Sequence, residues 1–243
     1  KGVQFFDQGR FHEALSVFKG MEREAPSDYE VLLNIALCME NLQDLVGASK
    51  YYRKSIAVSP NSAVAWGALG ALHSRKGDGE EAVKAYSKAI AIEPLNAELF
   101  YNRGNAEQAR SGHAAAAKDF KKAANLRPDY YQAWNNLGSA YMSMAENKKA
   151  IDALRKTLTF IPTHPIPLTN LVVMENRQCD WSRRSKHIAL LKKALYQETS
   201  EGRALVTPFH SFEFDLTPHE CKINALAWSQ RVDERVKHLA GFE

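Results

Sequence analysis

Four asparagines in the chain are spaced so regularly that a repeated structure would bring their side chains to one surface. Asn102, Asn136 and Asn170 follow one another at intervals of 34 residues, and Asn34 precedes Asn102 by two such intervals, with Ala68 in the place between. A carboxamide group has a hydrogen-bond donor and an acceptor, so it can bind a peptide bond whatever side chain the ligand carries. The spacing therefore predicts a surface that binds polypeptide in an extended form.

Residues suited to catalysis are few and lie near the C-terminal end of the sequence. His210 is the single candidate for a general base, which would have to reach an acceptor hydroxyl group, although a histidine at a loop bend is also a common structural residue. Glu213 and Asp215 would share one side of an extended segment, either as a carboxylate pair or as two exposed acids. His210 and His219 lack a third ligand at a useful spacing, so no metal site is expected. The sequence also lacks a glycine-rich loop that would bind phosphate groups.

Prolines recur with the same period through the first two thirds of the chain. Because proline disfavours helix at the residue before it, each of them predicts the end of a helix. The five prolines, each 34 residues after the last, are Pro26, Pro60, Pro94, Pro128 and Pro162.

Residue size follows the same frame. When each of these prolines is placed at position 32 of a repeat, position 8 is glycine or alanine and position 20 is alanine in every repeat, whereas position 24 is an aromatic residue or leucine. Small residues let two helices approach closely, and large residues fill the space beside them. The pattern predicts stacked helical hairpins. Full repeats in this frame start at Tyr29, Ala63, Ala97 and Tyr131, after a partial first repeat.

The frame resembles the tetratricopeptide repeat, and residues 63–96 match it best. The resemblance implies an all-α fold, a right-handed superhelical solenoid of about five repeats over residues 1–164. The four asparagines then occupy position 6, opposite the packed face, and would line the concave groove. Asparagine is also common at this position in many such repeats, so the row is either a peptide-binding feature or a general feature of the family. The residues at family positions are Trp66, Leu69, Gly70, Ala82, Tyr86, Ala89 and Pro94.

The repeat pattern weakens after residue 164. If Pro165 is position 1 of a further repeat, position 8 is Val172, position 20 is Arg184 and position 32 is Tyr196, so residues 165–198 are predicted to be a degenerate repeat. An atypical last repeat is common in solenoids. Residues 199–243 are expected to form a loop and a helix that begins with a capping box at Thr217, which completes a divergent, mostly helical C-terminal segment.

This last part carries a more specific pattern. Cys179-Asp180-Trp181 is followed by a helix rich in basic residues and then by Pro208-Phe209. The succession resembles the linker of the O-GlcNAc transferase and Spindly-like glycosyltransferase family, in which tetratricopeptide repeats lead into a catalytic domain. The resemblance covers the chain from Cys179 to about Leu239, roughly a quarter of its length.

The resemblance implies that the repeats present protein substrates to a nucleotide-sugar-dependent domain beyond Glu243, with UDP-GlcNAc or GDP-fucose as the donor. A loop histidine considered catalytic in the family falls on Phe209 here, and the neighbouring histidine falls on His210, so the match departs from the family at this point. The chain alone is expected to be inactive and to contain no cofactor. The alternative is a non-enzymatic adaptor that assembles partner proteins, which requires only the repeats. In either case we expect protein or peptide partners in the groove, and the repeats also offer a surface for a homodimer.

Charge and composition argue against other classes. The net charge of +4 comes from basic residues interleaved with acidic ones, unlike the basic stripe of a nucleic-acid-binding protein. The longest uncharged run, residues 157–174, contains three prolines and is a poor membrane helix. Three widely separated cysteines, Cys38, Cys179 and Cys221, are typical of free thiols in a reducing compartment. We therefore expect the protein in the cytoplasm, the nucleus or both.

Overall fold

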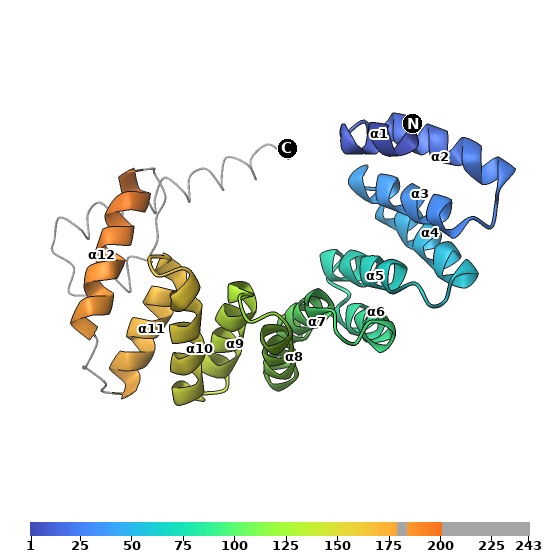
Figure 1. The fold of residues 1–243 in the computed structure, drawn as a ribbon. Helices are drawn as coiled ribbons and strands as arrows, with labels where there is room; N and C mark the ends of the chain where they lie inside the picture. The colour runs from blue at the N-terminus through green and yellow to red at the C-terminus, as the bar shows by residue number, and fades with distance from the viewer. Residues whose placement is uncertain (179–183, 201–243) are drawn as a thin grey trace, which may run out of the picture. The chain divides into compact units, whose positions relative to one another are not determined.

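The computed structural model describes residues 1–178 and 184–200, and within these ranges every regular element is an α-helix (Figure 1). The prediction of an all-α repeat fold is confirmed. The described helices are α1 (Gly2–Asp7), α2 (Phe11–Glu24), α3 (Tyr29–Asn41), α4 (Leu45–Val58), α5 (Ala63–Arg75), α6 (Gly79–Ile92), α7 (Ala97–Ala109), α8 (His113–Leu126), α9 (Tyr131–Ser143), α10 (Asn147–Phe160), α11 (Pro165–Gln178) and α12 (Arg184–Ser200).

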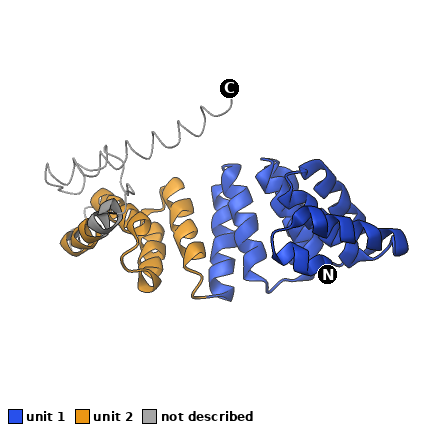
Figure 2. Ribbon diagram, turned by 90° about the horizontal axis from the view of Figure 1, so that it is seen from above, with its two compact units in different colours: residues 1–127 blue, residues 128–243 orange. Residues whose placement is uncertain are grey.

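The chain divides into two compact units, which Figure 2 shows in different colours. The N-terminal unit, residues 1–127, contains α1 to α8, and the described part of the C-terminal unit, residues 128–243, contains α9 to α12. In both units consecutive helices form hairpins. The first helices α3, α5, α7 and α9 have 13 residues each and begin 34 residues apart, and each is followed by a second helix of 14 residues.

Side-chain caps fix where three of the first helices begin. The carboxylate of Asp28 accepts hydrogen bonds from two backbone N–H groups of α3, the hydroxyl of Ser62 accepts one in α5, and the carboxamide of Asn96 accepts two in α7. These bonds satisfy amide groups that the helix itself leaves unpaired.

The turn inside each of the five hairpins from α1–α2 to α9–α10 has a left-handed residue at position 15 of the repeat. Two of the five residues are glycines, Gly9 (φ 73°) and Gly77 (φ 79°), for which this conformation is free of strain. The others, Gln43 (φ 63°), Ser111 (φ 62°) and Ala145 (φ 57°), have a Cβ atom that meets the following carbonyl group. The hairpin geometry therefore holds three residues in a conformation that their own chemistry disfavours.

The last described hairpin, α11 and α12, is closed by larger side chains than those of the repeats before it. Val172, at the position that is glycine or alanine elsewhere, is completely buried and packs with Leu168 against Ile188 and Leu191 of α12. Helix α12 has 17 residues rather than 14 and begins three positions later in the frame. The departure from the repeat pattern at Val172 therefore changes how the hairpin packs without removing it.

A buried ion pair replaces an apolar contact in the N-terminal unit. Position 7 of α7 is Arg103, whereas the same position is isoleucine or leucine in α3, α5, α9 and α11. Its guanidinium donates two hydrogen bonds of 2.7 Å to the buried carboxylate of Asp119 in α8 and one of 3.0 Å to Ser87 in α6. The bonds to Asp119 raise the pKa of Arg103. The pair joins three helices and holds α7, which carries Asn102, in place.

Replacing Ala145 by glycine should stabilise the chain. The substitution removes the left-handed strain at a small cost in chain entropy, so we expect the free energy of unfolding to rise by about 0.5–1 kcal/mol. The matched control is Gly77→Ala, whose Cβ would meet no atom within 4 Å, so that its effect reports the backbone alone. Thermal melts followed by circular dichroism should show opposite shifts, and shifts of the same sign would contradict this account of the turn.

Removing one partner of the Arg103–Asp119 pair should destabilise the N-terminal unit strongly. Asp119→Ala leaves a partly buried guanidinium without its carboxylate, for which we expect a loss of about 3 kcal/mol in urea denaturation. The double variant Arg103→Leu, Asp119→Ala restores the apolar residue of the other repeats and should recover most of that loss. A double variant less stable than Asp119→Ala would show that the pair contributes more than mutual neutralisation.

Candidate functional site

The two predicted site asparagines of the N-terminal unit lie half-buried on first helices, Asn34 on α3 and Asn102 on α7. Their neighbours Ile35 and Gly104 are buried in the hairpins, so the asparagines lie at the margin of the packed core. Neither carboxamide forms a hydrogen bond with any residue that the structure describes. Each therefore offers a donor and an acceptor to a ligand.

In the C-terminal unit the predicted residue Asn136 has a second carboxamide beside it. Asn135 Nδ2 donates a hydrogen bond of 3.3 Å to Asn136 Oδ1. The remaining oxygen, Asn135 Oδ1, is buried and has no hydrogen-bond partner among the described residues. Asn170 on α11 is half-buried, and the hydroxyl oxygen of its neighbour Thr169 is also buried without such a partner in that part of the chain.

The buried acceptors of Asn135 and Thr169, which have no partner among the described residues, are available to a ligand. A buried polar atom without a hydrogen bond costs about 1–3 kcal/mol. A peptide N–H group or a water molecule that reached Asn135 or Thr169 would remove that cost. The amide-bearing surfaces, by which we mean Asn34 and Asn102 in the N-terminal unit and Asn135, Asn136 and Asn170 in the C-terminal unit, are thus each suited to hydrogen bonding with a polypeptide backbone.

The N-terminal unit has two further polar features near the C-terminal ends of its first helices. Glu40 of α3 accepts hydrogen bonds of 2.6 Å from Arg75 of α5 and from the phenol of Tyr52. Burial and the nearby Glu40 carboxylate raise the pKa of Tyr52, so the phenol stays protonated and keeps donating. A cavity of about 280 Å³ lies at the C-terminal ends of α5 and α7, lined in part by Ser74, Asn105 and Arg110.

Several predicted residues lie outside the described part of the structure. They are the general-base candidate His210, the carboxylates Glu213 and Asp215, and the linker residues Cys179, Asp180, Trp181, Pro208 and Phe209.

The described residues themselves offer little for covalent or metal chemistry. They contain no group of three or more histidine, cysteine or acidic side chains that could hold a metal ion. Burial raises the pKa of the free thiol of Cys38 to about 11, so it is not the thiolate that a nucleophile requires. No helix in residues 1–178 and 184–200 is long and apolar enough to cross a membrane. What the arrangement can do is bind.

Sequence reasoning missed Asn135 and the Arg103–Asp119 pair. Asn135 occupies position 5 of its repeat, one residue before Asn136. The sequence prediction considered position 6 alone and therefore did not include it. The pair had a visible signal, since a charged residue at position 7 interrupts a column of isoleucine and leucine.

Three sequence models of the tetratricopeptide repeat match the chain. A model described as tetratricopeptide repeat matches residues 5–72, one described as TPR repeat matches residues 75–109, and a third, again described as tetratricopeptide repeat, matches residues 101–165. The chain therefore contains a tetratricopeptide-repeat region. No curated protein matches the chain at a significant level of sequence similarity.

Solved structures with the same fold are also repeat proteins. A crystal structure of YrrB, described as a TPR protein with an unusual peptide-binding site, has a TM-score of 0.65 at 18% identity and covers 73% of this chain and 91% of its own. MamA from Desulfovibrio magneticus has a TM-score of 0.63 at 22% identity, over 67% of this chain and 92% of its own. PilF of Pseudomonas aeruginosa has a TM-score of 0.66 at 17% identity, over 83% and 94%. At these identities the likeness concerns the fold.

Proposed function

We propose that this chain is a protein-binding scaffold whose tetratricopeptide repeats hold extended polypeptide of a partner on the amide-bearing surface of each unit. The observation that carries the proposal is the set of half-buried carboxamides whose hydrogen-bonding capacity is unused within the described residues, above all Asn34 and Asn102 in one unit and Asn135 Oδ1 in the other. The peptide-binding site named for YrrB supports the same kind of partner.

Carboxamides suit a scaffold that accepts many sequences. Each can donate to a backbone carbonyl group and accept from a backbone N–H group, and neither bond depends on the ligand's side chains. A hydrogen bond of this type contributes about 1 kcal/mol, so several in succession are needed for useful affinity. The row therefore favours long unfolded segments over short folded epitopes.

Replacing Asn102 or Asn136 by alanine should weaken binding of an unfolded polypeptide. With about 1 kcal/mol lost in each case, we expect the Kd to rise about fivefold per substitution. The probe is a fluorescently labelled, carboxymethylated protein that cannot fold, and the measurement is fluorescence anisotropy.

Two further variants make this experiment decisive. Asn61→Ala alters an exposed asparagine outside the row and should leave the Kd unchanged. Ala68→Asn completes the row and should lower the Kd. If Asn102→Ala and Asn136→Ala bind the probe as the unaltered chain does, asparagine at position 6 is a feature of the repeat family and not a binding device.

A second function is favoured by the linker sequence. Cys179-Asp180-Trp181, a basic helix and Pro208-Phe209 follow the repeats in the order found in the O-GlcNAc transferase and Spindly-like family. On this proposal the scaffold delivers its bound polypeptide to a catalytic domain outside residues 1–243, which uses UDP-GlcNAc or GDP-fucose. A cytoplasmic or nuclear location fits both functions, because both act on intracellular polypeptides.

The glycosyltransferase proposal predicts sugar transfer by the full-length protein and none by residues 1–243 alone. Both donors should be tested with an unfolded acceptor protein, and transfer followed by mass spectrometry of the acceptor. A full-length protein that folds, binds polypeptide and transfers neither sugar would leave the scaffold as a non-enzymatic adaptor. The matched control is the same reaction without donor.

A further inference from the structure

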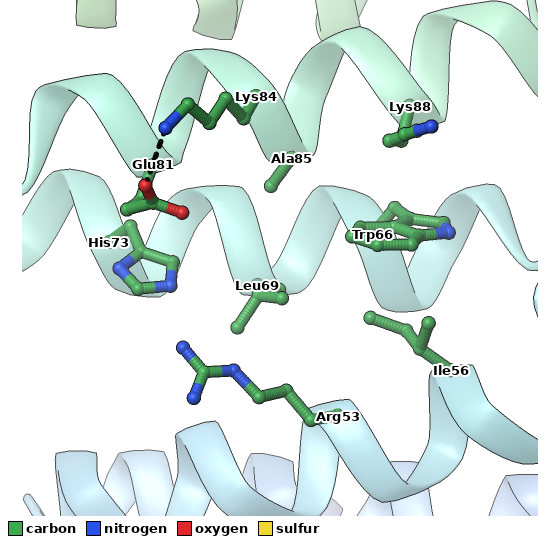
Figure 3. Close-up of a pocket in the computed structure, with 9 residues that line it drawn as sticks. All are labelled: Arg53, Ile56, Trp66, Leu69, His73, Glu81, Lys84, Ala85 and Lys88. Carbon is green, nitrogen blue, oxygen red and sulfur yellow. Dashed lines mark hydrogen bonds and ion pairs between the residues drawn. The ribbon is translucent and has the colours of Figure 1, made fainter.

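A cavity of about 420 Å³ opens in the N-terminal unit between α4, α5 and α6 (Figure 3). Its inner wall is apolar, with Leu69 and Ala85 buried and Trp66 and Ile56 half-buried. Exposed cationic side chains, Arg53 of α4 and Lys84 and Lys88 of α6, surround the opening, together with Glu81 and the buried His73. Figure 3 shows the Arg53 side chain reaching from α4 toward Leu69 and His73.

The cavity lies where three elements of neighbouring repeats meet. Arg53 occupies position 25 of its repeat and lines the cavity from α4. The next repeat contributes Leu69 at position 7 and His73 at position 11, both on α5, and Ala85 at position 23, on α6. We call these four positions an inter-repeat cluster. The same positions can be compared elsewhere in the chain, within each compact unit.

The cluster of α6, α7 and α8 is filled by the chain's own charges. Position 25 is Ser87, position 7 is Arg103 and position 23 is Asp119, and the guanidinium of Arg103 donates hydrogen bonds of 2.7 Å to Asp119 and of 3.0 Å to Ser87. The cation at this cluster therefore has a carboxylate in direct contact.

The cluster of α10, α11 and α12 in the C-terminal unit is filled in the same way by different residues. Position 25 is Arg155, which donates a hydrogen bond of 3.0 Å to the fully buried Glu175 at position 11. His187 at position 23 places Nδ1 at 2.9 Å from the other oxygen of Glu175. Here too the cation is neutralised inside the protein, and the imidazole occupies the space that alanine leaves open at residue 85.

The cluster of α2, α3 and α4 also pairs its cation with side chains of the same unit. Position 25 is Lys19, whose ammonium contacts the hydroxyl group of Tyr51 at position 23 and lies 3.1 Å from the carboxylate of Glu22. It also lies 4.0 Å from the centroid of the Tyr51 ring. Three clusters with different residues thus all satisfy their cation with groups of the same unit.

The cluster of Arg53 is the exception. His73 Nδ1 lies 3.3 Å from Asp78 and is already engaged, and Ala85 has no polar group to offer. Lys84 is paired with Glu80 and Glu81 at 2.8 Å. In the part of the chain that the structure describes, Arg53 and Lys88 form neither an ion pair nor a hydrogen bond. The cavity therefore combines an apolar wall with cations that lack a carboxylate.

We propose that this cavity is a second protein-binding site, which takes a carboxylate side chain of a partner protein on Arg53 and an adjoining large apolar side chain against Trp66 and Ile56, while Lys88 on the α6 side of the opening adds to its positive charge. The other clusters supply the precedent, because each pairs its cation with an oxygen-bearing side chain. The cavity residues of α5 lie at positions 4, 7 and 11, on the other side of the helix from Ala68 at position 6. The site is therefore separate from the amide-bearing surface of this unit and adds a preference for acidic and apolar sequence.

The test uses the 243-residue chain labelled with ¹⁵N and the peptide acetyl-Glu-Asp-Leu-Phe-amide as the probe. We expect saturable shifts of the indole N–H signal of Trp66, assigned with Trp66→Phe. The matched peptide acetyl-Gln-Asn-Leu-Phe-amide should bind at least tenfold more weakly. Arg53→Gln should raise the Kd of the acidic peptide about tenfold, and Ala85→Met should abolish binding by filling the cavity. Unchanged thermal melts would show that both variants fold.

The controls separate this site from the amide-bearing surfaces. Lys84→Gln removes a rim cation that is already paired and should change the Kd less than twofold. Asn102→Ala and Asn136→Ala should not change it at all. Equal affinity for the acidic and neutral peptides, absence of a Trp66 shift at 5 mM peptide, or full binding by Arg53→Gln would each overturn the proposal. A dimer of the chain that Arg53→Gln dissociates would assign the cavity to a second copy instead, and would overturn it as well.

Discussion

The fold depends on one close contact inside each of the hairpins from α1–α2 to α9–α10, between a residue with little or no side chain at position 8 and a large side chain at position 24. A Cβ atom added at Gly104 would lie 2.7 Å from the ring of Phe120, and one added at Gly70 would lie 2.9 Å from the ring of Tyr86. Such distances are below van der Waals contact, so the two helices are as near to each other as their backbones allow. The completely buried alanines at position 20, such as Ala82 and Ala116, show the same closeness from the second helix.

This closeness decides which side chains must face the neighbouring repeat. Once positions 8, 20 and 24 are used within the hairpin, positions 7, 11, 23 and 25 are left to fill the space between hairpins. A charged residue at one of them loses part of its hydration, and it is tolerated when a partner from the next helix neutralises it. Arg103 with Asp119 and Arg155 with Glu175 are two solutions with different residues. Repeats with similar backbones therefore differ from one another in the charged and polar side chains of their inter-repeat clusters.

The fold was predictable because its signals are local and repeated. The 34-residue period, the helix-ending prolines and the alternation of small and large residues all lie within one hairpin, so a single sequence displays them several times. The left-handed residues at position 15 were not predicted, because only two of the five, Gly9 and Gly77, are glycine, the residue that commonly adopts this conformation. Glu175 and His187 were also missed, since they meet Arg155 only after neighbouring hairpins have packed.

The candidate site was predictable to the extent that the repeat frame places residues on a helix face. It located Asn34, Asn102, Asn136 and Asn170 on half-buried positions of first helices, and their role in binding stays a prediction. The repeat frame does not tell which hydrogen-bonding or charged groups lack a partner, because that depends on all the atoms packed around each group. That Asn135 Oδ1 and Arg53 have no partner among the described residues could be learned only from the packed structure. His210 and the linker residues fall outside the described residues, so the glycosyltransferase proposal still rests on sequence.

The repeat at residues 63–96, which matches the family best, is the one that lacks both local specialisations. It has Ala68 where the other repeats have asparagine, and Ala85 where others carry the aspartate, tyrosine or histidine that fills the inter-repeat cluster. Alanine at each of these two positions leaves out a polar side chain that other repeats have, and the consequence differs between the two positions. At Ala68 the result is a shorter row of amides. At Ala85 it is a cavity in which Arg53 has no ion-pair partner among the described residues, and this opening is the one that we propose as a site for a partner's carboxylate and apolar side chains.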